Sequence, residues 1–129
     1  MADEPIPDDI KRFIFKSIDS IAQLEALLLL RRQPQEAWNA QTLAKRLYIS
    51  EQETSRLLDH LYAEGFLRLT SAEPPLYCYH PQPDELGQMV DHLAEAYAKH
   101  LVPVTNLIHA KSRTRIQEFA DAFKLRKDE

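Results

Sequence analysis

Two predicted helices joined by a short turn, with a glycine directly after the second, constrain the fold of this chain more than any other feature. The first is expected over Ala40–Leu47, where apolar side chains recur at helical spacing. The second is expected over Ser50–Glu64. It opens with a capping box of Ser50 and Glu53, and Gly65 follows as the expected terminator. Because each helix buries only one face, the neighbouring segments must supply the rest of the core.

A β-hairpin is predicted directly after these helices. The segments Phe66–Thr70 and Leu76–His80 are both rich in strand-forming residues, and Ser71–Pro75 between them has the composition of a turn. Before the helices, Glu36–Asn39 contains the only tryptophan, Trp38, and is expected to form a brief strand or an extended anchor. The chain has only two glycines, which disfavours an all-β fold with many tight turns.

Helices are also expected before and after this central unit. On the N-terminal side, a capping box of Ser20 with Gln23 favours a break near Ser17–Ser20, and the next helix ends at Gln33 because a proline follows.

On the C-terminal side, Asp84 is expected to cap a helix whose apolar stripe continues past Pro103, which indicates a kink. A further capping box, Thr114 with Gln117, predicts a last helix from about Thr114.

This order of elements resembles bacterial winged helix-turn-helix transcription regulators, in particular those similar to the multiple-antibiotic-resistance regulator. The resemblance covers about half the chain and lies in Leu43–Ser50, Ser55–Leu61 and Glu64–Leu67. It implies that Ala44 is the small residue that lets the two helices cross closely. Many members carry a glycine in the turn where this chain has Tyr48.

The predicted fold class is mainly α with a small β-hairpin, arranged as a winged helix-turn-helix with N- and C-terminal helical extensions. The expected divisions are an N-terminal arm with a short helix at 1–19, the winged helix-turn-helix domain at 20–83 and a C-terminal helical arm at 84–129.

The resemblance implies a DNA-binding transcriptional regulator that acts on double-stranded DNA as a homodimer in the bacterial cytoplasm. Side chains at the base edges would come from the second helix, and cations around it would contact phosphates. The candidate DNA-binding residues are Gln52, Ser55 and Arg56 at the groove and Lys45, Arg46 and Arg68 at the phosphates.

Charge favours an alternative interpretation. The formal net charge of the chain is −4, and the second helix carries Glu51, Glu53, Asp59 and Glu64 against the single cation Arg56. Carboxylates repel the phosphate backbone, and the expected wing tip has no Arg or Lys. The alternative is a protein–protein interaction module whose acidic helix docks on a basic protein partner without direct DNA binding. The residues leave both interpretations open.

The C-terminal arm is the candidate dimerisation element, because flanking helices commonly form the dimer in the family that the chain resembles. The same stripe would also suit an arm that folds back over the chain's own core, and the sequence does not separate these alternatives. The candidate dimerisation residues are Leu86, Val90, Leu93, Tyr97, Leu101, Val104, Ile108, Phe119 and Phe123.

The last part of the arm, from Lys111 to Lys127, is basic. It is interpreted as a solvated tail, with binding of nucleic acid or of an acidic partner as the alternative.

Other chemistry is not expected. Cys78 is the only cysteine and is interpreted as a small buried hydrophobe. The histidine and cysteine spacing does not match a metal site, no cofactor motif is present, and no pattern for a nucleophile or a carboxylate pair indicates an enzyme. The longest apolar run, Ala26–Leu30, is too short to span a bilayer, so a cytoplasmic protein without membrane contact is expected.

Overall fold

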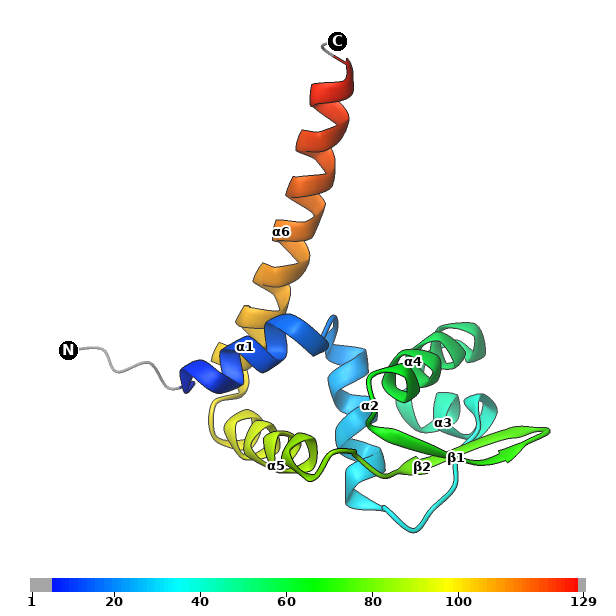
Figure 1. The fold of residues 1–129 in the computed structure, drawn as a ribbon. Coiled ribbons are helices and arrows are strands. Elements are labelled where there is room, and N and C mark those ends of the chain that lie inside the picture. Colours follow the sequence, from blue (N-terminus) through cyan, green and yellow to red (C-terminus); the bar gives the residue numbers. More distant parts are fainter. Residues whose placement is uncertain (1–5, 128–129) are drawn as a thin grey trace.

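The structure, a computed structural model, describes the backbone of residues 6–127 and the side chains of residues 6–114. The described part is mainly helical and has a small two-stranded antiparallel hairpin (Figure 1). The elements follow in this order: α1 (Asp8–Ser17), α2 (Ile21–Arg32), α3 (Ala40–Leu47), α4 (Glu51–Ala63), β1 (Leu67–Ala72), β2 (Pro75–Tyr79), α5 (Asp84–Lys99) and α6 (Leu101–Lys127).

The predicted break between the first two helices is confirmed. The α2 helix starts after Ser20, whose side chain accepts a hydrogen bond from the Gln23 N–H. Gln23 is buried, and its amide group donates to the Ser17 carbonyl at 2.8 Å and accepts from the Asp19 N–H at 2.8 Å. The same side chain therefore closes the end of α1 and fixes the linker to α2.

One apolar core joins the three segments that the sequence analysis separated. Completely buried side chains come from α1, α2, the α3–α4 pair and both C-terminal helices; examples are Ile14, Leu27, Leu61, Leu93 and Ile108. Figure 1 shows α1 and α5 at the base of α6, and the α3–α4 pair with the hairpin on the other side of α2. Beyond its base, α6 projects away from the rest of the chain.

The hairpin pairs Leu67 with Tyr79 and Leu69 with Tyr77, and its register shifts between Leu69 and Ser71. Both strands are shifted toward the tip of the hairpin relative to the prediction. Ser71, Ala72 and Pro75 belong to strands, so only Glu73 and Pro74 remain between them, and Phe66 and His80 lie outside the strands. The expected strand around Trp38 is reduced to one bridge, in which Trp38 exchanges two backbone hydrogen bonds of 2.8 Å with Tyr77.

Three expectations for the C-terminal arm are wrong. Pro103 does not kink a continuous helix, because α5 ends at Lys99 and Pro103 lies in the first turn of α6, where its missing N–H has no intrahelical partner to lose. No helix begins at Thr114; its hydroxyl donates to the Ala110 carbonyl within α6. Asp84 is the first residue of α5 and makes no side-chain cap.

Candidate interaction face of α3, α4 and the hairpin

The α4 helix is held by caps at both ends and by one buried stripe. The Ser50 hydroxyl accepts from the Glu53 N–H at 3.0 Å, as the capping-box pattern predicts for that half of the box. Thr54, Leu58 and Leu61 are buried against the core. After α4, Gly65 has a φ of +92°, and the Phe66 N–H donates to the Leu61 carbonyl at 3.0 Å. The opposite side of α4 is therefore presented rigidly to solvent.

The three residues predicted to enter a DNA groove are all exposed on α4. Gln52 and Arg56 are four residues apart and share the side of the helix that faces away from the buried stripe. Ser55 lies toward the hairpin, where it lines a groove with Pro75 and Tyr77. The fold thus leaves this set of polar side chains accessible on one rigid helix.

The carboxylates of α4 are also exposed, but they are divided between its two flanks. Glu51 and Asp59 line the groove on the hairpin side. Glu53 and Glu64 lie at helical spacing with His60 on the other flank. The outermost side of the helix is therefore less acidic than its total charge suggests.

The groove between α4 and the hairpin has a volume of about 360 Å³. At its wall, the Tyr77 ring packs 5.6 Å from the Tyr62 ring, and the Tyr77 hydroxyl donates to Asp59 at 3.5 Å. Burial raises the pKa of Tyr77, and the neighbouring Asp59 carboxylate raises it further. The residues that line the groove are Asn39, Ala40, Gln41, Glu51, Ser55, Leu58, Asp59, Pro74, Pro75 and Tyr77.

Tyr48, in the turn between α3 and α4, adopts the left-handed conformation with a φ of 58° and a ψ of 40°. This is the backbone conformation that glycine adopts without a steric penalty, so the turn keeps its shape with a tyrosine. The Tyr48 side chain is 93% exposed. It borders a shallow hollow that Lys45 and Glu51 also line.

The predicted phosphate-contacting cations are exposed but do not share one surface. Lys45 lies beside the start of α4. The Arg46 guanidinium lies 5.5 Å from the centre of the Trp38 ring, where it makes a cation–π contact.

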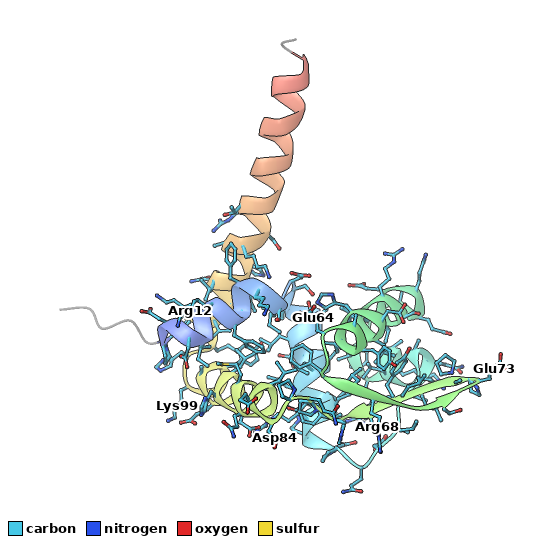
Figure 2. The ribbon with its side chains drawn as sticks, viewed as in Figure 1. Arg12, Glu64, Arg68, Glu73, Asp84 and Lys99 are labelled. Carbon is cyan, nitrogen blue, oxygen red and sulfur yellow. The ribbon has the colours of Figure 1, made fainter. Side chains whose placement is uncertain are left out.

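Arg68 lies on the outer part of the hairpin, where it lines a shallow hollow that Tyr62 of α4 also lines. It pairs with Cys78 across the hairpin, and its guanidinium lies 3.7 Å from the Cys78 Sγ atom. Because side chains alternate along a strand, this pair lies on the hairpin face opposite Tyr77, which contacts α4. Figure 2 shows Arg68 on that side of the hairpin. Arg68 and Arg56 therefore do not form one contact surface.

The candidate dimerisation residues have different environments. Val90, Leu93, Val104 and Ile108 are completely buried in the chain's own core, as the fold-back alternative expects, and offer no surface to a second copy. Leu86 and Tyr97 are partly buried, and Tyr97 donates a hydrogen bond of 2.7 Å to Glu25. Leu101 is exposed, and the side chains of Phe119 and Phe123 lie outside the described ones.

A polar cluster at the end of α1 has no counterpart among the predictions from the sequence. Lys111, interpreted as part of a solvated tail, is only 3% exposed. Its ammonium group donates to the Ile14 and Ile18 carbonyls at 3.0 and 2.9 Å and pairs with the Asp19 carboxylate at 2.9 Å. No local pattern signals this role, because the partners of Lys111 lie more than 90 residues earlier in the chain.

Cys78 is buried, as expected. The described side chains include no group of three or more His, Cys, Asp or Glu residues arranged to hold a metal ion. Among residues 6–127, no helix combines the length and apolar character that a bilayer span requires.

Comparison of the chain with protein-family models, curated proteins and solved structures finds no match.

Proposed function

We propose that the chain is a winged helix-turn-helix transcriptional regulator that binds double-stranded DNA through α4. The observation that carries the proposal is the exposed polar side of α4, with Gln52, Ser55 and Arg56 on a helix capped at both ends and flanked by a hairpin. Such a helix fits the major groove, where amide and guanidinium groups read base edges.

The roles follow from where the side chains lie. Gln52 and Arg56 would contact base edges, and Lys45 beside the start of α4 would contact a phosphate. Arg46 lies against Trp38 and Arg68 against Cys78, so both would contribute mainly to the electrostatic potential around the domain.

Binding to mixed-sequence duplex DNA at several salt concentrations tests the proposal. We expect Arg56→Ala to weaken binding by about tenfold and to make the salt dependence shallower by about one phosphate contact. Arg12→Ala is the matched control, because Arg12 is exposed on α1, away from α4 (Figure 2). Absence of binding by the wild-type chain at low salt, or equal effects of the two substitutions, would refute the proposal.

The proposed regulator is a cytoplasmic homodimer, with α6 as the contact. Leu101 and Val102 are exposed in its first turn, and the helix continues to Lys127 beyond the body of the chain (Figure 1). A two-fold pair of α4 helices would match the two half-sites of a symmetric operator.

A second function is favoured by the carboxylates that line the groove, Glu51 and Asp59. In this alternative the groove side of α4 binds a basic protein partner and not DNA. The double reversal Glu51→Lys with Asp59→Lys separates the two functions. It should strengthen DNA binding if α4 lies against phosphates, and abolish binding of an arginine-rich peptide if the groove accepts a basic partner. Glu85→Lys, exposed at the start of α5, is the control.

A further inference from the structure

Lys111 is one of the residues that attach α6 to α1, beside the buried Val104 and Ile108. Its ammonium group lies at the end of α1 and is shielded from water, because the side chain is buried. The two carbonyls that it contacts, those of Ile14 and Ile18, belong to the last turn and the C-cap of α1. A buried ammonium needs this complete set of acceptors, so α6 has one favoured position against α1.

Asp19 is the residue at which α6 and α4 meet. One carboxylate oxygen pairs with Lys111 of α6 at 2.9 Å, and the other lies 3.9 Å from the His60 Nε2 atom of α4. The Asp19 carbonyl also accepts from the Ser112 hydroxyl of α6 at 3.4 Å. The His60 ring also contacts the last residue of α1, with its Nε2 atom 3.4 Å from the Ser17 carbonyl oxygen.

The linker that carries Asp19 is held at a fixed position. Gln23 binds the Ser17 carbonyl on one side of Asp19 and the Asp19 N–H itself. Ile18, next to Asp19, is completely buried. Because the linker backbone is held, a displacement of Lys111 would change the contacts of the Asp19 side chain and leave the position of its backbone unchanged.

We propose that Asp19 couples the position of α6 to that of α4, so that α6 acts as a regulatory arm. With the arm seated, Lys111 holds Asp19 against His60 and the C-terminal half of α4 is fixed. When the arm is displaced, Asp19 loses its buried partner, the restraint on His60 weakens, and that half of α4 opens more often although Leu58 and Leu61 stay packed on the core. The coupling is independent of DNA; its use to control an operator rests on the proposed function.

Hydrogen–deuterium exchange of the full chain tests the coupling. We expect Lys111→Met to speed exchange of the α4 amides around His60 by about fivefold or more, while α3 is unchanged. Lys99→Met is the matched control, since Lys99 is exposed on α5 and pairs with Glu95 within the same helix. Faster exchange confined to α1 and α6 would overturn the proposal, because Lys111 would then hold the arm alone.

Two further variants keep the test decisive if Lys111→Met does not fold. Asp19→Asn retains the shape of the side chain and should loosen α4 in the same way. Because coupling is reciprocal, His60→Gln should speed exchange at the base of α6, around Val104–Lys111. Unchanged exchange of α4 in Asp19→Asn, or of α6 in His60→Gln, refutes the coupling.

DNA titrations on the same samples separate the coupling from the proposed function. If the wild-type chain does not bind DNA, the proposed function is refuted, while the exchange data still decide the coupling.

Discussion

Two tyrosines, Tyr79 and Tyr97, are held in surroundings that disfavour their ionised forms. The Tyr79 hydroxyl is buried and has no hydrogen-bond partner among the described residues. Burial is the main reason that its pKa is raised to about 12; the Asp91 carboxylate adds to the effect, and Arg31 opposes it. Burial also raises the pKa of Tyr97 to about 12, with a further contribution from its hydrogen bond to Glu25.

These phenols predict a loss of stability in alkali. The unfolded chain releases the phenol protons near pH 10 and the folded chain near pH 12, so the unfolded state binds fewer protons between these values. The free energy of unfolding should be fully retained below pH 10 and fall as the pH rises toward 12. Denaturant titrations of the wild type and of Tyr79→Phe check this point.

The Tyr79→Phe variant should lose less stability over that range. At neutral pH it should equal or exceed the wild type by up to about 1 kcal/mol, because it removes a buried hydroxyl without a partner. A variant with an unchanged alkaline profile would contradict this explanation.

Gly65 is the other residue whose environment is decisive. Any other residue at this position would need a backbone φ of +92°, and its Cβ atom would lie 3.0 Å from the Gln82 carbonyl oxygen. We expect Gly65→Ala to destabilise the fold by about 2 kcal/mol, measured by urea denaturation. Gly87→Ala is the comparison: its Cβ would meet only the Pro81 ring, at 3.1 Å, without a positive φ. An equal loss in both variants would show that the backbone at Gly65 is not the cause.

At the scale of elements, the turn between α3 and α4 is strained for the residue that occupies it. Tyr48 adopts left-handed geometry and its side chain is almost fully exposed, so little packing compensates for the strain. The turn nevertheless sets the angle at which α4 leaves α3. A substitution at this turn can therefore raise the stability of the chain.

We expect Tyr48→Gly to stabilise the chain by about 0.5–1 kcal/mol, since relief of the left-handed strain exceeds the added entropy of the unfolded chain. Tyr48→Ala keeps the strain and removes the ring, so it should not share the gain. Thermal and urea denaturation of the three chains provide the measurement. If alanine and glycine give the same stability, the strain at this turn is negligible.

Element boundaries were predictable where adjacent residues decide them. The caps at Ser20 and Ser50 and the glycine after α4 act within a few residues, and the sequence locates these boundaries correctly. The break before Pro103 depends on packing of two helices against α1, which no local pattern contains.

The candidate face follows the same rule. Exposure of Gln52 and Arg56 follows from the helical period. The direction of Arg68 depends on strand parity, and a shift of one residue would reverse it. The burial of Lys111 depends on acceptors from the other end of the chain. Patterns along the sequence therefore predict the face of α4 and miss its surroundings.

At the scale of the whole molecule, the buried parts of α5 and α6 stabilise the single chain, and the proposed homodimer would use the later part of α6. Ile116, Phe119 and Phe123 recur at helical spacing beyond the described side chains. We expect the double variant Phe119→Glu with Phe123→Glu to shift a dimer to monomer in sedimentation equilibrium. Gln117→Glu, outside that spacing, should leave the dimer intact. A monomeric wild type at the highest soluble concentration would contradict the proposed homodimer.

The seat of Lys111 near the base of a long helix has a mechanical consequence. The helix from Lys111 to Lys127 is about 24 Å long, so a tilt of about 10° at Lys111 moves its far end by about 4 Å. In such a tilt, α6 would pivot about its contact with the end of α1. A displacement at the far end of α6 is therefore accompanied by a much smaller displacement at the ammonium–carboxylate pair of Lys111 and Asp19.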